Sequence, residues 1–433
     1  MPGPLSSALI PTMIRTRQPG LWINPDLGTP ASERVDLVRQ VDGAIDRLAR
    51  ADGLLRSLFK IPENDGSVLS SDLIDASDYA TSVGEIGAWY VKADHALPVA
   101  GSVKARGGFH EVIAFAERLA VDAGLVGKGA DLIALNSPVV RSLFSSYTVA
   151  VGSTGNLGLA IGMMASALGF RAVVHMSSDA KEWKKARLRE RGVEVVEHPG
   201  DYAQAVALGR ELASRSPSTH FVDDERSVDL FVGYAAAAKE LQRDLYSAGI
   251  VVDASSPLFV YLPCGVGGAP GGITFGLKLV FGESVHCFFV EPVASPCMLV
   301  QLSSNSDEPT SVYDLGLDNR TELDGLAVGQ ASMLVAPLMK SRLSGIYTVA
   351  DDEAFRLLGI AHDVMHLGLE PSAAAALAGP TRLLRSEAGQ NYLSVRALGD
   401  KLSSSTHVMW TTGGAIVPEE ERKRFLERAR AGR

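Results

Sequence analysis

Lys104 is the first residue of this chain whose type and position favour covalent chemistry. It lies in the segment Pro98-Val-Ala-Gly-Ser-Val-Lys-Ala-Arg-Gly-Gly108, directly ahead of a predicted helix with an apolar stripe. The positive end of the helix dipole and partial burial both favour the neutral amine, which forms Schiff bases with aldehydes. The glycine pair that ends the segment permits close approach of another backbone. By spacing alone, a surface lysine ahead of a helix is the more common case.

Two loops further along the chain have the character of anion-binding sites. Ser153-Thr-Gly-Asn-Leu-Gly158 follows a predicted strand and opens a predicted helix, so its backbone N–H groups suit a carboxylate. The glycine-rich segment Pro263-Cys-Gly-Val-Gly-Gly-Ala-Pro-Gly-Gly272 suits a phosphate. It lacks the GK[ST] ending of a nucleotide P-loop and does not fit GxGxxG in register. A simple phosphomonoester is therefore favoured over a nucleotide.

A turn with hydroxyl side chains completes the set. Trp410-Thr-Thr-Gly-Gly414 follows a predicted strand, and the hydroxyl of Thr412 can hydrogen-bond a ring nitrogen without protonating it. A cofactor held in this way is a mild electron sink, which suits elimination chemistry. Taken alone, the same residues fit a helix cap equally well. A phosphate cradle together with an aldehyde-accepting lysine indicates pyridoxal 5'-phosphate (PLP).

The order of these motifs resembles that of the fold-type-II PLP enzymes, the superfamily of serine/threonine dehydratases and tryptophan synthase β. The closest resemblance is to the bacterial-type D-serine dehydratases, and it runs from about residue 90 to the end. Besides the segments above, it rests on Val-His-Met-Ser-Ser-Asp-Ala-Lys-Glu-Trp-Lys-Lys-Ala (174–186), Glu-Pro-Val-Ala-Ser-Pro-Cys-Met-Leu (291–299), Asp-Gly-Leu-Ala-Val-Gly (324–329) and Gly-Gly-Ala-Ile-Val-Pro-Glu-Glu-Glu (413–421).

This resemblance implies a role for each matching residue. Lys104 would carry the cofactor as a Schiff base, Asn156 would contact its 3-hydroxyl, and Thr412 would face the pyridine nitrogen. Backbone N–H groups would bind the phosphate, and they belong to Gly265, Val266, Gly267 and Gly268. Ala269 stands where the family pattern has another glycine, and its methyl group would crowd the phosphate if its φ were positive.

The substrate and a cation also receive residues from this resemblance. The substrate carboxylate would rest on Ser153, Thr154 and Gly155. A monovalent cation, K⁺ or Na⁺, often supports the family, and Glu291 is the candidate ligand. Asp223 and Asp224 follow a predicted strand, so they would bind the ammonium or hydroxyl of the substrate or cap the next helix.

The implied reaction is PLP-dependent α,β-elimination from D-serine, which gives pyruvate and ammonia, with D-threonine as a slower substrate. In L-specific relatives the Schiff-base lysine takes the α-proton, but a D-substrate anchored by the same carboxylate presents that proton to the opposite face. Thr154 lies in the right loop to act there or to orient another group. Two alternatives stay open at this point. They are an L-serine/L-threonine dehydratase on the same fold and a non-catalytic PLP-binding scaffold.

The elements that position these motifs alternate between strands and helices. Strands are predicted at 147–151, 171–176, 193–197, 220–222, 258–262, 285–290 and 407–410, and helices at 157–168, 180–191, 202–213 and 228–245. This alternation predicts an α/β fold, with two open, twisted, mostly parallel sheets flanked by helices. By resemblance, residues 145–226 form a small mobile domain, and 76–144 with 227–433 form the large PLP-binding domain. Residues 1–75 form an N-terminal helical extension packed on the large domain.

Composition narrows the class of partner. The 433 residues carry a net charge of −9, which disfavours nucleic acid, and no apolar run approaches the length of a membrane span. Three cysteines without a disulfide pattern indicate reduced thiols in a cytoplasmic enzyme. We therefore expect a monomer whose partner is a small amino acid. The basic stretch at 180–191 is interpreted as a solvated helix face. The acid-poor N-terminus is interpreted as flexible rather than as a targeting segment.

Overall fold

The structure is a computed structural model, and it describes residues 11–30, 34–63, 66–85, 87–153, 155–178, 180–199 and 202–432. The chain divides into two compact units. Unit 1 comprises Met1–Glu33, Ser71–Ala96 and Ala237–Arg433, and unit 2 comprises Arg34–Ser70 and Leu97–Ala236. Residues 145–226 lie inside unit 2, together with 34–70 and 97–144, so the units are bounded differently from the predicted domains. That 145–226 moves as a small domain stays a prediction.

Unit 1 is built on a seven-stranded sheet of order β1-β10-β9-β8-β11-β3-β2. Its strands are β1 (Leu21–Ile23), β2 (Leu73–Asp75), β3 (Ala88–Lys92), β8 (Leu258–Pro263), β9 (Val285–Pro292), β10 (Gly345–Val349) and β11 (Thr406–Trp410). The five central strands are parallel, and the edge strands β1 and β2 are antiparallel to their neighbours. Every residue of β8 and β9 is buried, as expected of parallel strands covered on both faces.

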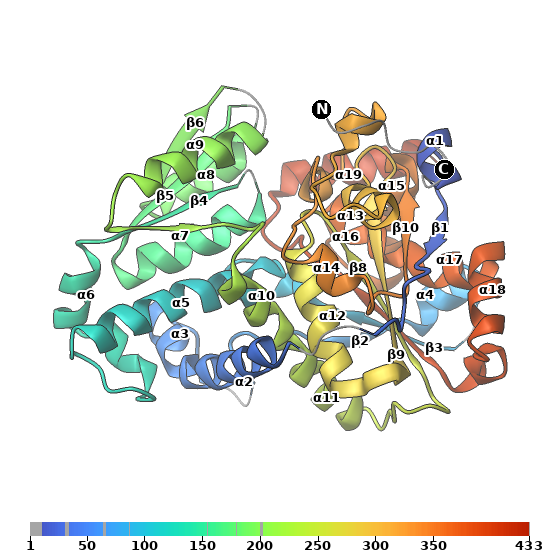
Figure 1. Cartoon of the computed structure of the whole chain (residues 1–433), viewed down its shortest axis with the longest axis horizontal. Coiled ribbons are helices and arrows are strands. Elements are labelled where there is room, and N and C mark those ends of the chain that lie inside the picture. Colours follow the sequence, from blue (N-terminus) through green and yellow to red (C-terminus); the bar gives the residue numbers. More distant parts are fainter. Residues whose placement is uncertain are drawn as a thin grey trace. The chain divides into compact units, whose positions relative to one another are not determined.

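Helices enclose the sheet of unit 1 (Figure 1). They are α1 (Thr12–Thr16), α4 (Ser77–Ser82), α11 (Ala237–Ser247), α12 (Gly268–Phe281), α13 (Cys297–Ser304), α14 (Ala336–Met339), α15 (Asp351–Met365), α16 (Pro371–Ala374), α17 (Gly379–Arg385), α18 (Glu387–Val395) and α19 (Glu419–Ala431). The core under them is rich in aromatic side chains, among them Trp89, Phe259, Tyr261 and Phe288. Such rings bury much apolar area, so they hold the strand ends rigidly.

Unit 2 contains a four-stranded, fully parallel sheet of order β6-β5-β4-β7. Its strands are β4 (Thr148–Gly152), β5 (Arg171–Ser177), β6 (Glu194–His198) and β7 (Thr219–Val222). Its helices are α2 (Val35–Arg50), α3 (Asp52–Phe59), α5 (Lys104–Asp122), α6 (Pro138–Phe144), α7 (Asn156–Leu168), α8 (Glu182–Glu190), α9 (Tyr202–Ser214) and α10 (Val228–Ala235). Helices α7 and α9 pack against β4 and β5, and α10 packs against α5 and α2 (Figure 1).

The predicted α/β fold with two mostly parallel sheets is confirmed. One predicted element is wrong, because the helix expected over 228–245 is two helices, α10 and α11, which separate at Ala236 and belong to different units. The short strands β1, β2, β3 and β10 were not predicted. Among the described residues, the helices include none that is both long and apolar enough to cross a membrane.

Candidate active site

Lys104 is the first residue of α5, and its amine is held by two residues of unit 2. Its Nζ lies 3.1 Å from Oδ2 of Asp224, in the loop between β7 and α10. The same Nζ lies 5.8 Å from the centre of the Tyr234 ring, on α10. The lysine side chain keeps 22% of its surface exposed, whereas Asp224 keeps 8%. Lys104 is therefore not the surface lysine that its spacing alone would favour, but a half-buried amine with a carboxylate partner.

Three buried polar atoms near Lys104 have no hydrogen-bond partner among the described residues. They are Oδ1 of Asp224, Oγ of Ser102 and the hydroxyl of Tyr234. Ser102 precedes Lys104 by two residues in the sequence. Asp224 and Tyr234 are the two residues that lie next to the lysine amine in space. Buried polar atoms of folded proteins are nearly always paired, so a polar ligand at this place would supply the partners that these three atoms lack.

The loop that carries Asp224 is fixed on both sides. Arg210 on α9 binds Asp223 at 2.8 Å and Glu225 at 3.1 Å, the two carboxylates that flank Asp224 in the sequence. Ser227 then caps α10 by accepting from the amide of Leu230. The sequence indicated two acidic residues here. Asp223 forms an ion pair with Arg210, whereas Asp224 forms an ion pair with Lys104.

The predicted carboxylate loop leads into the N-terminus of α7. Gly155 precedes the first helical residue, Asn156, and its amide donates to Oγ of Ser153 at 3.2 Å. This 13-residue helix has no side-chain cap, and amides at a helix N-terminus form an arrangement that favours an anion. Thr154, the residue proposed to act on the α-proton, lies outside the described residues.

Two lysines of α8 are buried, which corrects the expected solvated face. Lys184 and Lys185 are each only 3% exposed. Lys185 donates to the carbonyl of Ser178 at 2.8 Å and to Glu197 at 2.7 Å. The Nζ of Lys184 lies 4.0 Å from the point where a Cβ on Gly155 would stand, so its charge lies beside the predicted carboxylate loop. The charge run gave no sign of this, because burial depends on what packs over the helix.

In unit 1, the glycine-rich segment connects β8 to α12 as predicted. Gly267 caps α12 with a φ of +112°, a conformation that favours glycine, and a Cβ there would lie 2.5 Å from Cε of Met298. Within the described part of the chain, the amides of Gly265, Val266 and Gly267 have no acceptor. Ala269 lies in the helix without a positive φ, so its backbone is unstrained. The segment is thus a turn of donors at a helix N-terminus.

Glu291, the candidate cation ligand, is fully buried at the end of β9. Its two carboxylate oxygens accept the amides of Met298 at 2.7 Å and Leu299 at 2.9 Å, the first turn of α13. Burial raises the pKa of this carboxyl to about 8, although both amides oppose the shift. The described residues include no group of three or more acidic, histidine or cysteine side chains placed to hold a metal ion. The cation stays a prediction.

Thr412 follows β11 and is half-buried, next to a threonine that anchors the strand end. Thr411 donates its hydroxyl hydrogen to the carbonyl of Lys92 at 3.1 Å. Nδ1 of His95 lies 2.7 Å from the hydroxyl oxygen of Thr411, so it is the donor to that oxygen. Burial lowers the pKa of His95 to about 4, which keeps the ring neutral near pH 7. These bonds fix the backbone from which Thr412 projects.

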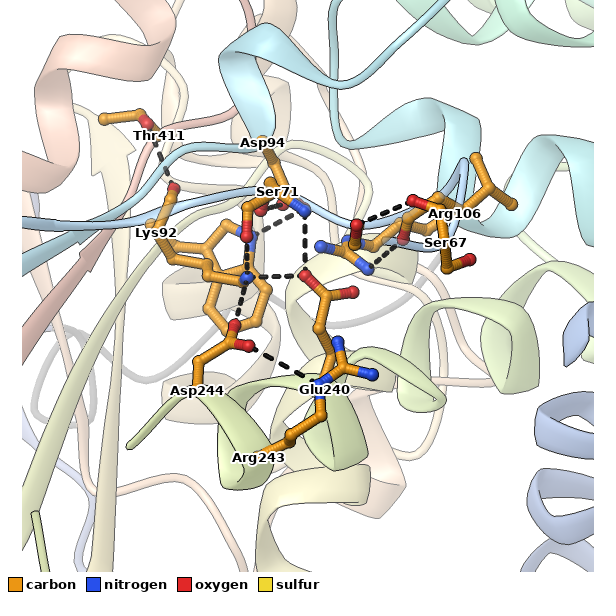
Figure 2. A network of polar contacts seen from close by, with 12 residues as sticks. Ser67, Ser71, Lys92, Asp94, Arg106, Glu240, Arg243, Asp244 and Thr411 are labelled. Carbon is orange, nitrogen blue, oxygen red and sulfur yellow. Dashed lines mark hydrogen bonds and ion pairs between the residues drawn. The ribbon is translucent and has the colours of Figure 1, made fainter. Parts of the chain in front are cut away.

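A buried charge network lies at the same end of β3 (Figure 2). Nζ of Lys92 is fully buried and donates to the carbonyl of Ser71, to Glu240 at 2.5 Å and to Asp244 at 2.7 Å. Asp94 accepts the hydroxyl of Ser71 at 2.7 Å and the indole N–H of Trp410 at 2.8 Å. Sequence reasoning missed this network, because its members are scattered singly along the chain.

The chain belongs to the family of pyridoxal-phosphate dependent enzymes, whose pattern matches residues 71–395. Two similar proteins named "Probable D-serine dehydratase" come from Cupriavidus pinatubonensis and Burkholderia pseudomallei. The first is 56% identical over 420 residues, covering 96% of this chain and 94% of that protein. The second is 53% identical over 440 residues, covering 100% of this chain and 98% of that protein.

Solved structures of the same fold include diaminopropionate ammonia lyase from Escherichia coli in complex with D-serine. It gives a TM-score of 0.74 at 18% identity, over 96% of this chain and 98% of that one. The processed form of threonine deaminase isoform 2 from Solanum lycopersicum gives 0.67 at 18% identity, over 95% and 98%. At such identities the likeness shows the fold alone, and it confirms the predicted fold-type-II architecture.

The residues of this chain fit PLP. Unit 1 offers a turn of unpaired amides at the N-terminus of α12, which suits a phosphate. Unit 2 offers a lysine beside buried polar atoms that have no partner among the described residues, which suits an aldehyde-bearing ring and an amino-acid substrate. Sequence reasoning missed Tyr234 and Ser102. The glycine pair at 107 and 108 indicated that another segment packs closely there, but it did not identify Tyr234 as the residue in contact.

Proposed function

We propose that this chain eliminates water from D-serine and yields pyruvate and ammonia, with PLP as its cofactor. The observation that carries the proposal is the Lys104 amine, paired with Asp224 and surrounded by buried polar atoms without partners in the described chain. The names of the two near full-length relatives support the substrate. The family membership supports the cofactor.

The proposal assigns the cofactor's groups to separate segments. The phosphate is bound by the backbone N–H groups of Gly265–Gly268, supported by the left-handed turn at Gly267. Lys104 holds the aldehyde carbon, and Asn156 donates to the ring hydroxyl. Thr412 faces the pyridine nitrogen, on a backbone fixed by the hydrogen bonds of Thr411. When bound, PLP supplies an aldehyde for the substrate amine and a ring that accepts the electrons of the Cα–H bond.

The substrate is held by residues of unit 2. Its carboxylate rests on Ser153, Thr154 and Gly155, where the dipole of α7 and the buried charge of Lys184 both favour an anion. Oδ1 of Asp224 accepts a hydrogen bond from the ammonium or the β-hydroxyl of the substrate. This contact satisfies a buried oxygen that is without a partner among the described residues, so the group that donates to it is part of what the site recognises.

Removal of the proton from Cα is the step that distinguishes the enantiomers. Lys104 takes it if D-serine binds in a flipped pose, whereas Thr154 takes it, or orients the base, if the carboxylate anchor is kept. The α-proton and the β-hydroxide leave as one water molecule. The released aminoacrylate then consumes one water and gives pyruvate and ammonia, so the balance closes without a redox partner.

The test is pyruvate formation from D-serine, L-serine and D-threonine by the PLP-loaded protein, with cofactor absorbance recorded on the same sample. The proposal predicts the highest rate with D-serine, a slower rate with D-threonine and little with L-serine. A higher rate with L-serine would favour the alternative L-serine/L-threonine dehydratase. Cofactor absorbance without turnover of any of the three would favour the scaffold.

Oligomeric state, cation use and location also belong to the proposal. We infer a cytoplasmic monomer, and light scattering on the purified protein tests the mass. We also propose that Glu291 helps to hold K⁺ or Na⁺ near the phosphate loop. Pyruvate formation measured in K⁺, Na⁺ and a bulky organic cation tests this role, and equal rates in all three would remove it.

A further inference from the structure

Tyr234 is a fully buried side chain whose ring has no role in the proposed chemistry, although it lies next to Lys104. Its ring centre is 5.8 Å from Nζ of Lys104, within the range of a cation–π interaction. Its hydroxyl has no partner among the described residues. Burial, with Asp224 nearby, raises the pKa of Tyr234 well above 10, so the ring stays a neutral phenol. A neutral aromatic face and a carboxylate thus contact the same amine.

Glycines on two packed helices allow this ring to lie close to the start of α5. A Cβ on Gly107 would lie 2.5 Å from Cζ of Tyr234 and 2.8 Å from the carbonyl oxygen of Leu230, so only glycine admits the ring at this depth. On the opposing helix, a Cβ on Gly233 would lie 3.0 Å from Cα of Gly107. The two helices therefore meet glycine to glycine. This close crossing brings Tyr234 up to the lysine.

We infer that Asp224 and Tyr234 form a seat for the Lys104 amine, occupied when the substrate's amine has replaced the lysine on the cofactor. In the structure the amine lies in this seat, 3.1 Å from Oδ2 of Asp224. Whenever the released lysine is protonated, as it is after it has taken a proton from the substrate, the carboxylate and the ring face stabilise its charge together. Tyr234 is thus a positioning residue. This inference rests on the proposed role of Lys104 as the cofactor's lysine.

The seat has a distinctive thermodynamic consequence. It stabilises every state in which Lys104 is free, and it does nothing for the state in which the lysine is bound to the cofactor. Removal of the ring should therefore weaken the displacement of lysine by an amino acid. The same change should leave the affinity for PLP unchanged or make it tighter, because a seat of this kind also stabilises the free lysine before PLP binds. A residue that only packs the core would weaken both.

The experiment compares Tyr234→Leu with Tyr234→Phe in the PLP-loaded protein. D-alanine and L-alanine lack the leaving hydroxyl, so they displace Lys104 without elimination, and the cofactor spectrum reports their binding. We expect Tyr234→Leu to raise the dissociation constant of the better-binding alanine by roughly 2- to 10-fold. Tyr234→Phe keeps the ring and should bind like the wild type. Tyr147→Leu, at the far end of the α5 packing where its ring meets Phe115, is the matched control.

Three outcomes would overturn the seat. The first is an unchanged alanine dissociation constant in Tyr234→Leu, and the second is a parallel loss of PLP affinity. The third is an equal effect in Tyr234→Phe, which would assign the role to the hydroxyl. Failure of the proposed function is a separate result. It would appear as wild-type protein that binds alanine but releases no pyruvate from D-serine.

Discussion

Replacing Lys92 by methionine should destabilise unit 1 strongly, because it breaks a buried charge network and leaves its acids behind. The amine is fully buried and serves three acceptors, two of which are the carboxylates of Glu240 and Asp244 (Figure 2). These side chains keep only 10% and 19% of their surface exposed. Methionine has a similar length, so packing changes little and the electrostatic loss dominates.

The expected cost follows from the loss of one partner in a buried ion pair, which is about 3–5 kcal/mol. Urea unfolding followed by tryptophan fluorescence measures it well, since Trp89 and Trp410 lie on β3 and β11 beside the network. Lys278→Met is the matched control. That lysine is partly buried and donates to a backbone carbonyl at 2.8 Å, so its removal leaves no carboxylate without its hydrogen-bond partner.

Neutralising the two acids as well should recover much of the loss. In Lys92→Met combined with Glu240→Gln and Asp244→Asn, no uncompensated charge remains buried. A loss below about 1 kcal/mol in the single variant would refute the reasoning, as would a triple variant no more stable than the single one. Either result would mean that water reaches the carboxylates and screens them.

Three further predictions concern the site and the pH response. Gly267→Ala should cost about 1–2 kcal/mol in local strain and weaken PLP binding. Gly43→Ala, where the new methyl meets open space, is the control and should do neither. A PLP affinity of Gly267→Ala equal to that of the wild type would contradict the phosphate assignment. Asp224→Asn should raise KM for D-serine roughly 10- to 100-fold while cofactor absorbance persists, and an unchanged KM would remove Asp224 from substrate binding. Burial lowers the pKa of His407 to about 3. In the unfolded chain this imidazole binds a proton below about pH 6.5, whereas in the native state it stays neutral down to about pH 3. The free energy of unfolding therefore falls as the pH is lowered from 6.5 towards 3. In His407→Gln the acid slope of unfolding free energy should be smaller by about 1.4 kcal/mol per pH unit, and an unaltered slope would refute this assignment.

Local sequence signals were sufficient for the long, strongly patterned elements. The predicted strand at 171–176 corresponds to β5, and the glycine-rich segment does connect a buried strand to a helix. The short strands β3 and β10 were missed, although β4, β6 and β11 have the same length and were predicted. Strand pairing depends on distant partners, so a five-residue segment need not show it in its own sequence. The single helix expected over 228–245 failed at Ala236, because the break falls within a run of four alanines, with no glycine or proline at the break itself.

The candidate site was predictable where a residue type has one typical chemistry, and hidden where tertiary packing decides. Lys104 was found through its segment and its family resemblance. The burial of Lys184 and the neutral ring of His95 were not predictable, since each depends on elements brought together only by the fold. Tyr234 was predictable only in part, because Gly107 indicated a close contact whereas only the structure identified the residue in contact.

The attachment point of the cofactor tests the central claim most directly. The PLP-loaded protein is treated with borohydride, which reduces the lysine–cofactor linkage to a stable bond, and its peptides are mapped by mass spectrometry. We predict the phosphopyridoxyl mass on Lys104, absent from Lys104→Ala and retained in Lys128→Ala, whose exposed lysine lies in the same unit. The label on another lysine, or on none, would contradict the account.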